Sequence, residues 1–109
     1  MPHVAAFFRG ISLTIAFELN RAMSTDELCE LFEQAYSSQE KIKVSKDIPQ
    51  VQSVQGTAEV HIGGFTIDER EPTQGSLVVV LDNLLKGAAS QAIQNLNLAF
   101  GLEEYTGIE

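Results

Sequence analysis

The sequence has little cysteine and little positive charge, and each shortage excludes a class of protein. Cys29 is the single cysteine, so no internal disulfide can form, which suits a reducing compartment. The 7 Lys and Arg residues are outnumbered by 15 Asp and Glu residues, and the formal net charge is -8. This balance argues against a general nucleic-acid binder, because neutralising phosphates requires a lysine- and arginine-rich surface.

Long apolar runs and low-complexity segments are also missing. No stretch approaches the ~20 apolar residues that cross a bilayer, and residues 1–8 lack the regions of a signal peptide. We therefore expect a cytoplasmic protein without a membrane partner. With 109 residues, 44% of them hydrophobic and 20% charged, residues 1–109 fit a single globular domain. The early first strand also fits a chain cut from a larger protein.

The first part of the chain predicts a strand followed by a helix. Residues 11–19 alternate between apolar side chains and small or polar ones, which indicates a strand with one buried face. Ser24 and Glu27 have the spacing of a capping box, with Ser24 as the N-cap. The apolar side chains that follow at helical spacing are Leu28, Leu31, Phe32, Ala35 and Tyr36. A helix over about residues 24–38 should therefore pack one side on a sheet.

Two further strands are predicted in the middle of the chain. Residues 41–44 resemble a short edge strand, and 45–55 read as a loop with extended pieces. Residues 57–67 form a longer strand with a change of parity, because Gly63-Gly64 separates the apolar pairs Val60/Ile62 and Phe65/Ile67. We predict a β-bulge at the glycines that turns both pairs into the core.

The last part of the chain predicts a central strand and a second long helix. Residues 77–81 are a continuous apolar run after a hairpin loop, which is typical of a strand covered on both faces. A helix over about residues 84–99 follows, with Gly101 as its stop. Its predicted apolar side consists of Leu85, Ala89, Ala92, Ile93, Leu96 and Phe100.

The expected order of elements is β-α-β-β-β-α. It predicts an α+β fold, a two-layer sandwich with a mainly antiparallel sheet and both helices on one face. The apolar run at 77–81 requires cover on the second face as well, and little of the chain remains to supply it. We therefore expect a homodimer in which the open sheet face meets another copy.

Three segments of the chain carry a resemblance to a known family. They are Pro2-His3-Val4-(x)4-Arg9-Gly10-Ile11, Gly56-Thr57-(x)4-Ile62-Gly63 and Asp82-Asn83-Leu84-Leu85-Lys86-Gly87-Ala88-Ala89-(x)-Gln91-Ala92-Ile93-Gln94-Asn95-(x)-Asn97. Together they resemble the C-terminal part of N-acetyl-gamma-glutamyl-phosphate reductase, an NADPH-dependent enzyme of arginine biosynthesis. The last segment alone is shared more loosely with aspartate-semialdehyde dehydrogenases, so the first one discriminates.

The resemblance implies a parent enzyme of two domains. A Rossmann domain would bind NADP(H), and this chain would be part of the substrate and dimerisation domain, as in the glyceraldehyde-3-phosphate/semialdehyde dehydrogenase superfamily. In that family a cysteine thiolate attacks the acyl phosphate and expels phosphate. Hydride from NADPH then reduces the thioester, and a histidine assists proton transfer on the way to N-acetylglutamate 5-semialdehyde.

The resemblance also assigns roles to residues of this chain. His3 matches the family's histidine and is the candidate general acid and base. Arg9 matches the arginine of an Arg-Gly-Ile motif and should steady the anionic substrate. Asn83, Lys86 and Gly87 match positions close to the bound cofactor, and small residues there would admit its approach. No metal site is expected.

Two family features have no counterpart here. The glycine-rich dinucleotide turn is absent, and the nucleophilic cysteine belongs to an upstream segment. We therefore expect the chain alone to be inactive and to bind no cofactor. Cys29 lies on the flank of an apolar helix stripe, where a thiol is usually a small hydrophobe. His61 stands where many members carry an acid, so its role stays open.

Less specific interpretations of the same residues remain open. Arg9 could close a local carboxylate pair, and the small residues 87–90 could serve tight packing. His3 could be a frayed terminal residue in this chain and catalytic only in the parent. The alternative to a reductase part is a stand-alone oligomerisation or small-ligand-binding module without reductase activity.

Overall fold

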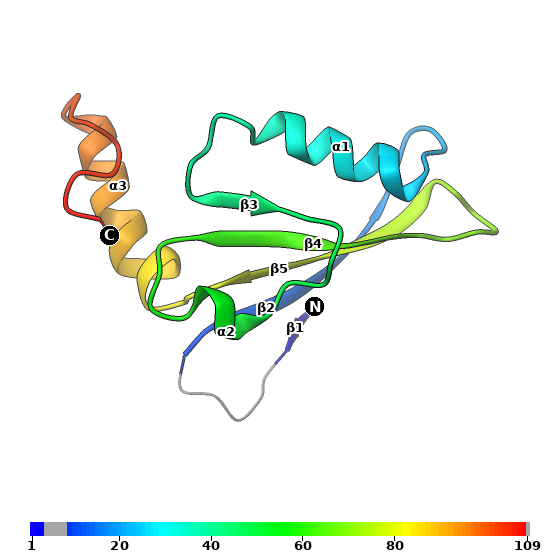
Figure 1. Ribbon diagram of the computed structural model, residues 1–109, viewed down its shortest axis with the longest axis horizontal. Coiled ribbons are helices and arrows are strands. Elements are labelled where there is room, and N and C mark those ends of the chain that lie inside the picture. Colours follow the sequence, from blue (N-terminus) through cyan, green and yellow to red (C-terminus); the bar gives the residue numbers. More distant parts are fainter. Residues whose placement is uncertain (4–8, 109) are drawn as a thin grey trace.

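A five-stranded mixed sheet forms the centre of the molecule (Figure 1). The structure is a computed structural model that describes residues 1–3 and 9–108, so Val4 of the opening motif lies outside it. The strands are β1 (Pro2–His3), β2 (Ile11–Glu18), β3 (Ile42–Val44), β4 (Val60–Ile67) and β5 (Gln74–Leu81). Their order across the sheet is β1-β2-β5-β4-β3, and only the β3–β4 pair among them is parallel. The α+β class and the central place of the 77–81 run are confirmed.

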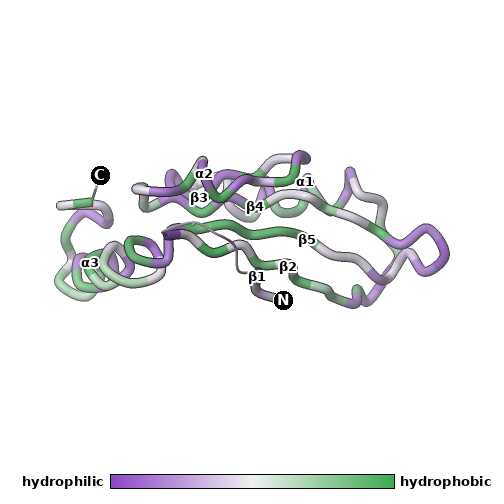
Figure 2. Tube along the Cα trace, turned by 90° about the horizontal axis from the view of Figure 1, so that it is seen from below, coloured by the Kyte–Doolittle hydropathy of each residue, from purple (hydrophilic) through white to green (hydrophobic). Residues whose placement is uncertain are grey.

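The helices do not lie together on one face, which corrects the predicted arrangement. α1 (Thr25–Ala35) packs against β3 and β4. α2 (Val51–Val54) contacts β5, and it interrupts the segment predicted as a loop. The π-helix η1 (Leu85–Ala89) and α3 (Ser90–Ala99) continue beyond the end of the sheet (Figures 1 and 2). Only α1 therefore occupies the place that was predicted for two helices. None of the helices in the described part of the chain could span a membrane.

The main core lies between α1 and the sheet. Its buried members are Leu28, Cys29, Ile62, Phe65 and Leu77. α1 begins as predicted, because Ser24 Oγ accepts a hydrogen bond from Glu27 N at 3.1 Å. The capping serine thus fixes where the helix starts, and the apolar stripe fixes which side it buries.

The predicted β-bulge in β4 is confirmed. The register with β5 shifts between Gly63 and Thr66, and Val60 and Ile67 pack against the same core that buries Ile62 and Phe65. Gly63 also lets the 45–49 loop lie on the sheet, because a Cβ at this position would be 2.2 Å from Asp47 O. The glycine pair therefore serves the strand register and the loop packing at once.

We expect Gly63→Ala to lower the free energy of unfolding by about 2 kcal/mol, because the added methyl group must displace backbone rather than a flexible side chain. Gly87→Ala is the matched control, since its Cβ would come no closer than 3.3 Å to Leu81 Cδ1. Urea unfolding of both variants measures the difference. Equal stability of the two would contradict this account of the close approach.

The second face of the sheet is covered in part by residues 45–55, which the sequence did not predict. Val54 and Val80 are both completely buried. A Cβ on Gly64 would contact Ile48 and Val78, so the loop before α2 lies over the Val78 side of β5. Val78 and Val80 share that face by strand alternation, opposite Leu77 and the α1 core. This small second core explains why the apolar run of β5 has no polar face.

The final helix buries its polar side and exposes its apolar side. Ser90, Gln94 and Asn97 are buried, while large apolar residues remain exposed at Ile93, Leu96, Leu98 and Phe100. Asn97 Nδ2 donates to the carbonyls of Glu104 and Thr106, both at 2.9 Å, so the 102–108 segment folds back on the polar stripe. The helix ends as predicted before Gly101, whose φ is +70°.

Candidate functional site

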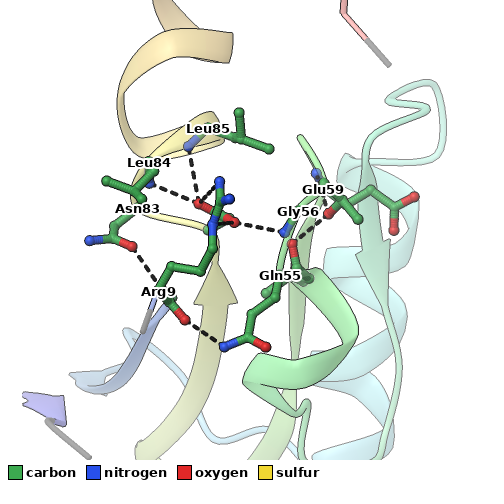
Figure 3. Close-up of polar contacts among 11 residues, drawn as sticks. Arg9, Gln55, Gly56, Glu59, Asn83, Leu84 and Leu85 are labelled. Atoms are coloured by element: carbon green, nitrogen blue, oxygen red, sulfur yellow. Dashed lines mark hydrogen bonds and ion pairs between the residues drawn. The ribbon is translucent and has the colours of Figure 1, made fainter. Parts of the chain in front are cut away.

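A buried carboxylate at the end of β5 organises the polar residues of this region (Figure 3). Asp82 follows the last residue of β5 and is completely buried. Its Oδ1 accepts hydrogen bonds from Leu84 N at 2.8 Å, Leu85 N at 3.1 Å and Arg9 Nη2 at 3.1 Å. Its Oδ2 accepts from Gly56 N at 2.7 Å and lies 2.5 Å from Arg9 Nε. The Nε–H is not aimed at an acceptor, so this last contact is an ion pair.

The carboxyl group of Asp82 stays ionised in this setting. Burial by itself raises the pKa of Asp82, because it penalises the charged form. The hydrogen bonds from Arg9, Gly56, Leu84 and Leu85 outweigh burial and leave the pKa below its usual range. A permanent carboxylate that is enclosed by donors is suited to holding structure and unsuited to giving up a proton.

Arg9 and its neighbour are also held through the main chain. Gln55 Nε2 donates to Arg9 O at 2.6 Å, and Gly10 N donates to Asn83 Oδ1 at 2.8 Å. Figure 3 shows these bonds on either side of Arg9. The entry into β2 is therefore fixed by side chains from two other segments. The carboxylate pair that the sequence left open for Arg9 is present, and its partner is Asp82.

Lys86 projects from η1 into a second polar chain. Its Nζ donates to Gln94 Oε1, and Gln94 Nε2 donates in turn to Glu104 Oε1 at 2.5 Å. Partial burial lowers the pKa of Lys86, although the negative charge of Glu104 opposes this effect. The ammonium group thus has a neutral amide as its direct acceptor and a carboxylate only in the next position.

His3 lies apart from this cluster, on the short edge strand β1. It is exposed, and its Nε2 is 2.7 Å from Thr14 Oγ1 on the neighbouring strand. Pairing of His3 with Ser12 and of Ile11 with Leu81 places the imidazole on the side of β2 away from β5. The hydroxyl of Thr14 orients the ring and leaves Nδ1 as the nitrogen without this contact.

Comparison with known proteins identifies the family. Residues 1–83 match the family described as semialdehyde dehydrogenase, dimerisation domain. The chain belongs to this family. An N-acetyl-gamma-glutamyl-phosphate reductase of Stenotrophomonas maltophilia is 49% identical over 99% of the chain and 34% of its own length. Protein arg-6, mitochondrial, of Neurospora crassa is 44% identical over 99% of the chain and 12% of its own length. The resemblance to these reductases is confirmed.

Solved structures agree with the family assignment. An aspartate semialdehyde dehydrogenase II from Vibrio cholerae has a TM-score of 0.72 and 27% identity, over 86% of the chain and 28% of that protein. The chain thus spans about a third of the length of the reductase and of the dehydrogenase that it matches. The expected likeness to the C-terminal domain of the semialdehyde dehydrogenase superfamily is confirmed, and membership of a dimerisation family supports self-association.

The predicted site residues of this chain fall into two groups. Arg9, Asn83 and Lys86 gather at the end of β5, whereas His3 lies on the edge strand. Gly87 is exposed and has no positive φ, and a Cβ there would meet the end of the flexible Leu81 side chain at 3.3 Å, so only a small shift of that side chain would be needed. Among the described residues, no group of three or more His, Cys, Asp or Glu side chains could hold a metal ion.

Sequence reasoning missed Asp82 and Gln55 as organising residues. Asp82 begins the third of the family-like segments, and its position directly after a buried apolar strand is a usable signal. A carboxylate there must find several donors or unfold the end of the strand. Gln55 carries no such signal, because its partner is a main-chain carbonyl 46 residues away.

Cys29 and His61 have local partners. Burial raises the pKa of Cys29, and Glu33, whose Oε1 accepts from Sγ at 3.6 Å, raises it further. The thiol is therefore neutral and enclosed in the core, unlike an activated nucleophile. His61 Nε2 is 2.9 Å from Glu59 Oε1, and both side chains are partly exposed.

Proposed function

We propose that this chain is the substrate and dimerisation part of an enzyme that reduces N-acetyl-gamma-glutamyl phosphate to N-acetylglutamate 5-semialdehyde, with release of phosphate. The observation that carries the proposal is the 49% identity to a reductase of that name over 99% of the chain. The alternative that the parent is an aspartate-semialdehyde dehydrogenase rests on a more distant likeness, the 27% identity to the Vibrio cholerae enzyme. A stand-alone binding module is not favoured, because the chain matches only part of each of two longer relatives, 34% of the reductase and 13% of a bifunctional protein argC, mitochondrial, of Dictyostelium discoideum.

In this proposal His3 exchanges protons with the reacting oxygen. An exposed imidazole held by Thr14 through one nitrogen can present the other to a substrate. The Nη1 edge of Arg9 makes no hydrogen bond to the described residues, and the side chain is 28% exposed. Asp82 thus turns one edge of the guanidinium inward, and the other edge can bind an anionic substrate group.

The cofactor of the parent enzyme would be NADP(H), which supplies hydride when bound. The donors near η1 fit an anionic group, because Lys86 has no direct carboxylate partner among the described residues and Asn83 uses its Oδ1 for Gly10 N. Asn83 Nδ2 and the Lys86 ammonium would then hold the cofactor from this side. The dinucleotide-binding domain itself would come from the remaining two thirds of the parent.

Enzyme assays test the proposal. The 109-residue chain should show no turnover with the acyl phosphate and NADPH, because the nucleophile and dinucleotide fold of the family have no counterpart in it. The full-length protein that carries this sequence should turn over, and aspartyl phosphate should be a poor substrate. Turnover by the isolated chain would contradict the domain assignment, and preference for aspartyl phosphate would contradict the substrate.

Self-association in this proposal uses an apolar groove beside α1. The groove has a volume of about 410 Å³, and Ile15 and Leu31 in its walls are 42% and 51% exposed. The predicted open face was the side opposite α1, but residues 45–55 cover part of that side. This apolar groove lies on the α1 side of β2. A second copy would bury it, and a cytoplasmic location is proposed for the assembly.

We expect Ile15→Asp to dissociate the assembly, since a charge would then be buried in an apolar contact. Ala16→Asp is the matched control, because Ala16 is exposed on the other face of the same strand. Sedimentation velocity of the two variants at micromolar concentration measures the outcome. Dissociation by Ala16→Asp alone would place the contact on the opposite face.

A further inference from the structure

Asp82 joins three segments that are far apart in the sequence. Arg9 is 73 residues away and Gly56 is 26 residues away, while Leu84 and Leu85 begin the turn into η1. No other described carboxylate is completely buried. A buried carboxylate is costly unless several donors enclose it, so its presence at a junction calls for a reason beyond packing.

Two of these segments carry residues of the proposed site. Residues 9–10 hold the candidate substrate-binding arginine and lead into β2, the strand that orients His3 through Thr14. The turn after β5 holds Asn83 and leads directly to Lys86 in η1. One carboxylate therefore sets the distance between the substrate side and the cofactor side of the site.

Residues next to Asp82 and Gly56 in the sequence make further hydrogen bonds to residues 9–10. Asn83, the next residue, accepts from Gly10 N, and Gln55, the residue before Gly56, donates to Arg9 O. Residues 9–10 are thus held through their main chain by the side chains of Gln55 and Asn83, and through the Arg9 side chain by Asp82. Oδ1 already accepts three hydrogen bonds, and Oδ2 accepts one and pairs with Nε. Neither oxygen remains to contact a ligand.

We propose that Asp82 is a positioning residue of the proposed reductase: it acts on the substrate through Arg9 and fixes the 9–10 segment against the turn that carries Asn83 and Lys86. This inference rests on the proposed function. Asp82→Asn keeps the size of the side chain and one acceptor for the Leu84 and Leu85 N–H groups. It removes the charge that orients the guanidinium.

The test uses the full-length protein at a temperature where every variant is folded. Asp82→Asn should lower kcat/KM for the acyl phosphate by about 10–100-fold, because small displacements of positioned groups cost that much. KM for the acyl phosphate should rise, since the Arg9 contact is made in the ground state. Phe65→Leu, which alters the main core, should leave kcat/KM within about twofold once folded.

A double-mutant cycle separates positioning from general damage. If Asp82 acts through Arg9, the double variant Arg9→Gln/Asp82→Asn should lose no more kcat/KM than Arg9→Gln alone. If the fold-losses in kcat/KM of the two single variants multiply in the double variant, the inference is overturned. It is also overturned if Asp82→Asn has a kcat/KM within about twofold of the original enzyme.

Hydrogen exchange supplies a measurement that does not depend on activity. In Asp82→Asn the amides of Gly10, Gly56 and Leu84 should lose protection together, while Phe65→Leu should leave these three in place. Unchanged protection at all three would overturn the inference. If the wild-type protein does not turn over the acyl phosphate but Asp82→Asn still shows this joint loss of protection, the proposed substrate is overturned. Asp82 then remains the residue that positions these segments.

Discussion

Replacing His3 by asparagine in the full-length protein is expected to lower kcat by roughly 10²–10⁴-fold, the usual contribution of general acid–base catalysis. The physical reason is the loss of the group that would pass a proton to and from the reacting oxygen. The pairing of β1 with β2 is made by the main chain, with Thr14 N donating to Met1 O at 2.9 Å, so it should persist without the imidazole. Steady-state kinetics with the acyl phosphate and NADPH give the measurement.

Two further variants separate this effect from damage to the fold. His61→Asn removes a histidine that is paired with Glu59, and it should leave kcat nearly unchanged. Thr14→Val removes only the hydroxyl that orients the imidazole, so kcat should fall by about tenfold or less, because the proton-transfer group itself remains. A His3→Asn enzyme with nearly normal kcat would exclude His3 as the proton-transfer residue.

Local patterns in the sequence predicted the features that local physics decides. The Ser24 cap, the bulge at Gly63-Gly64 and the central place of residues 77–81 each depend on a few neighbouring residues. A capping oxygen, a shift of parity across glycines and an unbroken apolar run have few alternative structures. The structure therefore confirms these three predictions.

The features that were missed depend on distant partners. α2 has only four residues, which is too short for an apolar period to show. The buried side of α3 is polar, because Gln94 and Asn97 bond to the 102–108 segment. The expectation that the apolar side of this helix is the buried one was therefore wrong. The Asp82 cluster joins residues 73 positions apart. A single sequence gives no distance information on that scale.

The ion pair of Asp82 with Arg9 should have the largest effect on stability. Arg9→Met is expected to lower the free energy of unfolding of this chain by about 3 kcal/mol at pH 7, because it leaves a buried carboxylate without its cation. Removing one partner of a buried pair costs about 3–5 kcal/mol. The lower end applies here, since Arg9 is 28% exposed and backbone amides still donate to Asp82. Urea unfolding gives the value.

The matched control for Arg9→Met is Arg21→Met. Arg21 pairs with Glu27 at 3.6 Å, and the two side chains are 66% and 53% exposed. Exposed pairs contribute about 0–1 kcal/mol, so Arg21→Met should change the free energy of unfolding by no more than that. Equal losses in the two variants would show that burial of Asp82 does not set the strength of its pair.

The pH dependence of the same variant follows from the direction of the Asp82 pKa. In the original chain the folded pKa of Asp82 is below its unfolded value of about 4, so its stabilising contribution is complete above that pH and is lost as the pH falls through the folded pKa. In Arg9→Met the folded pKa of Asp82 should be higher than in the original chain, because burial still raises it and the guanidinium no longer lowers it. The gap between the two proteins should therefore be widest near neutral pH and narrow below about pH 4. A gap that stays constant from pH 7 to pH 3 would show that the guanidinium acts by packing alone.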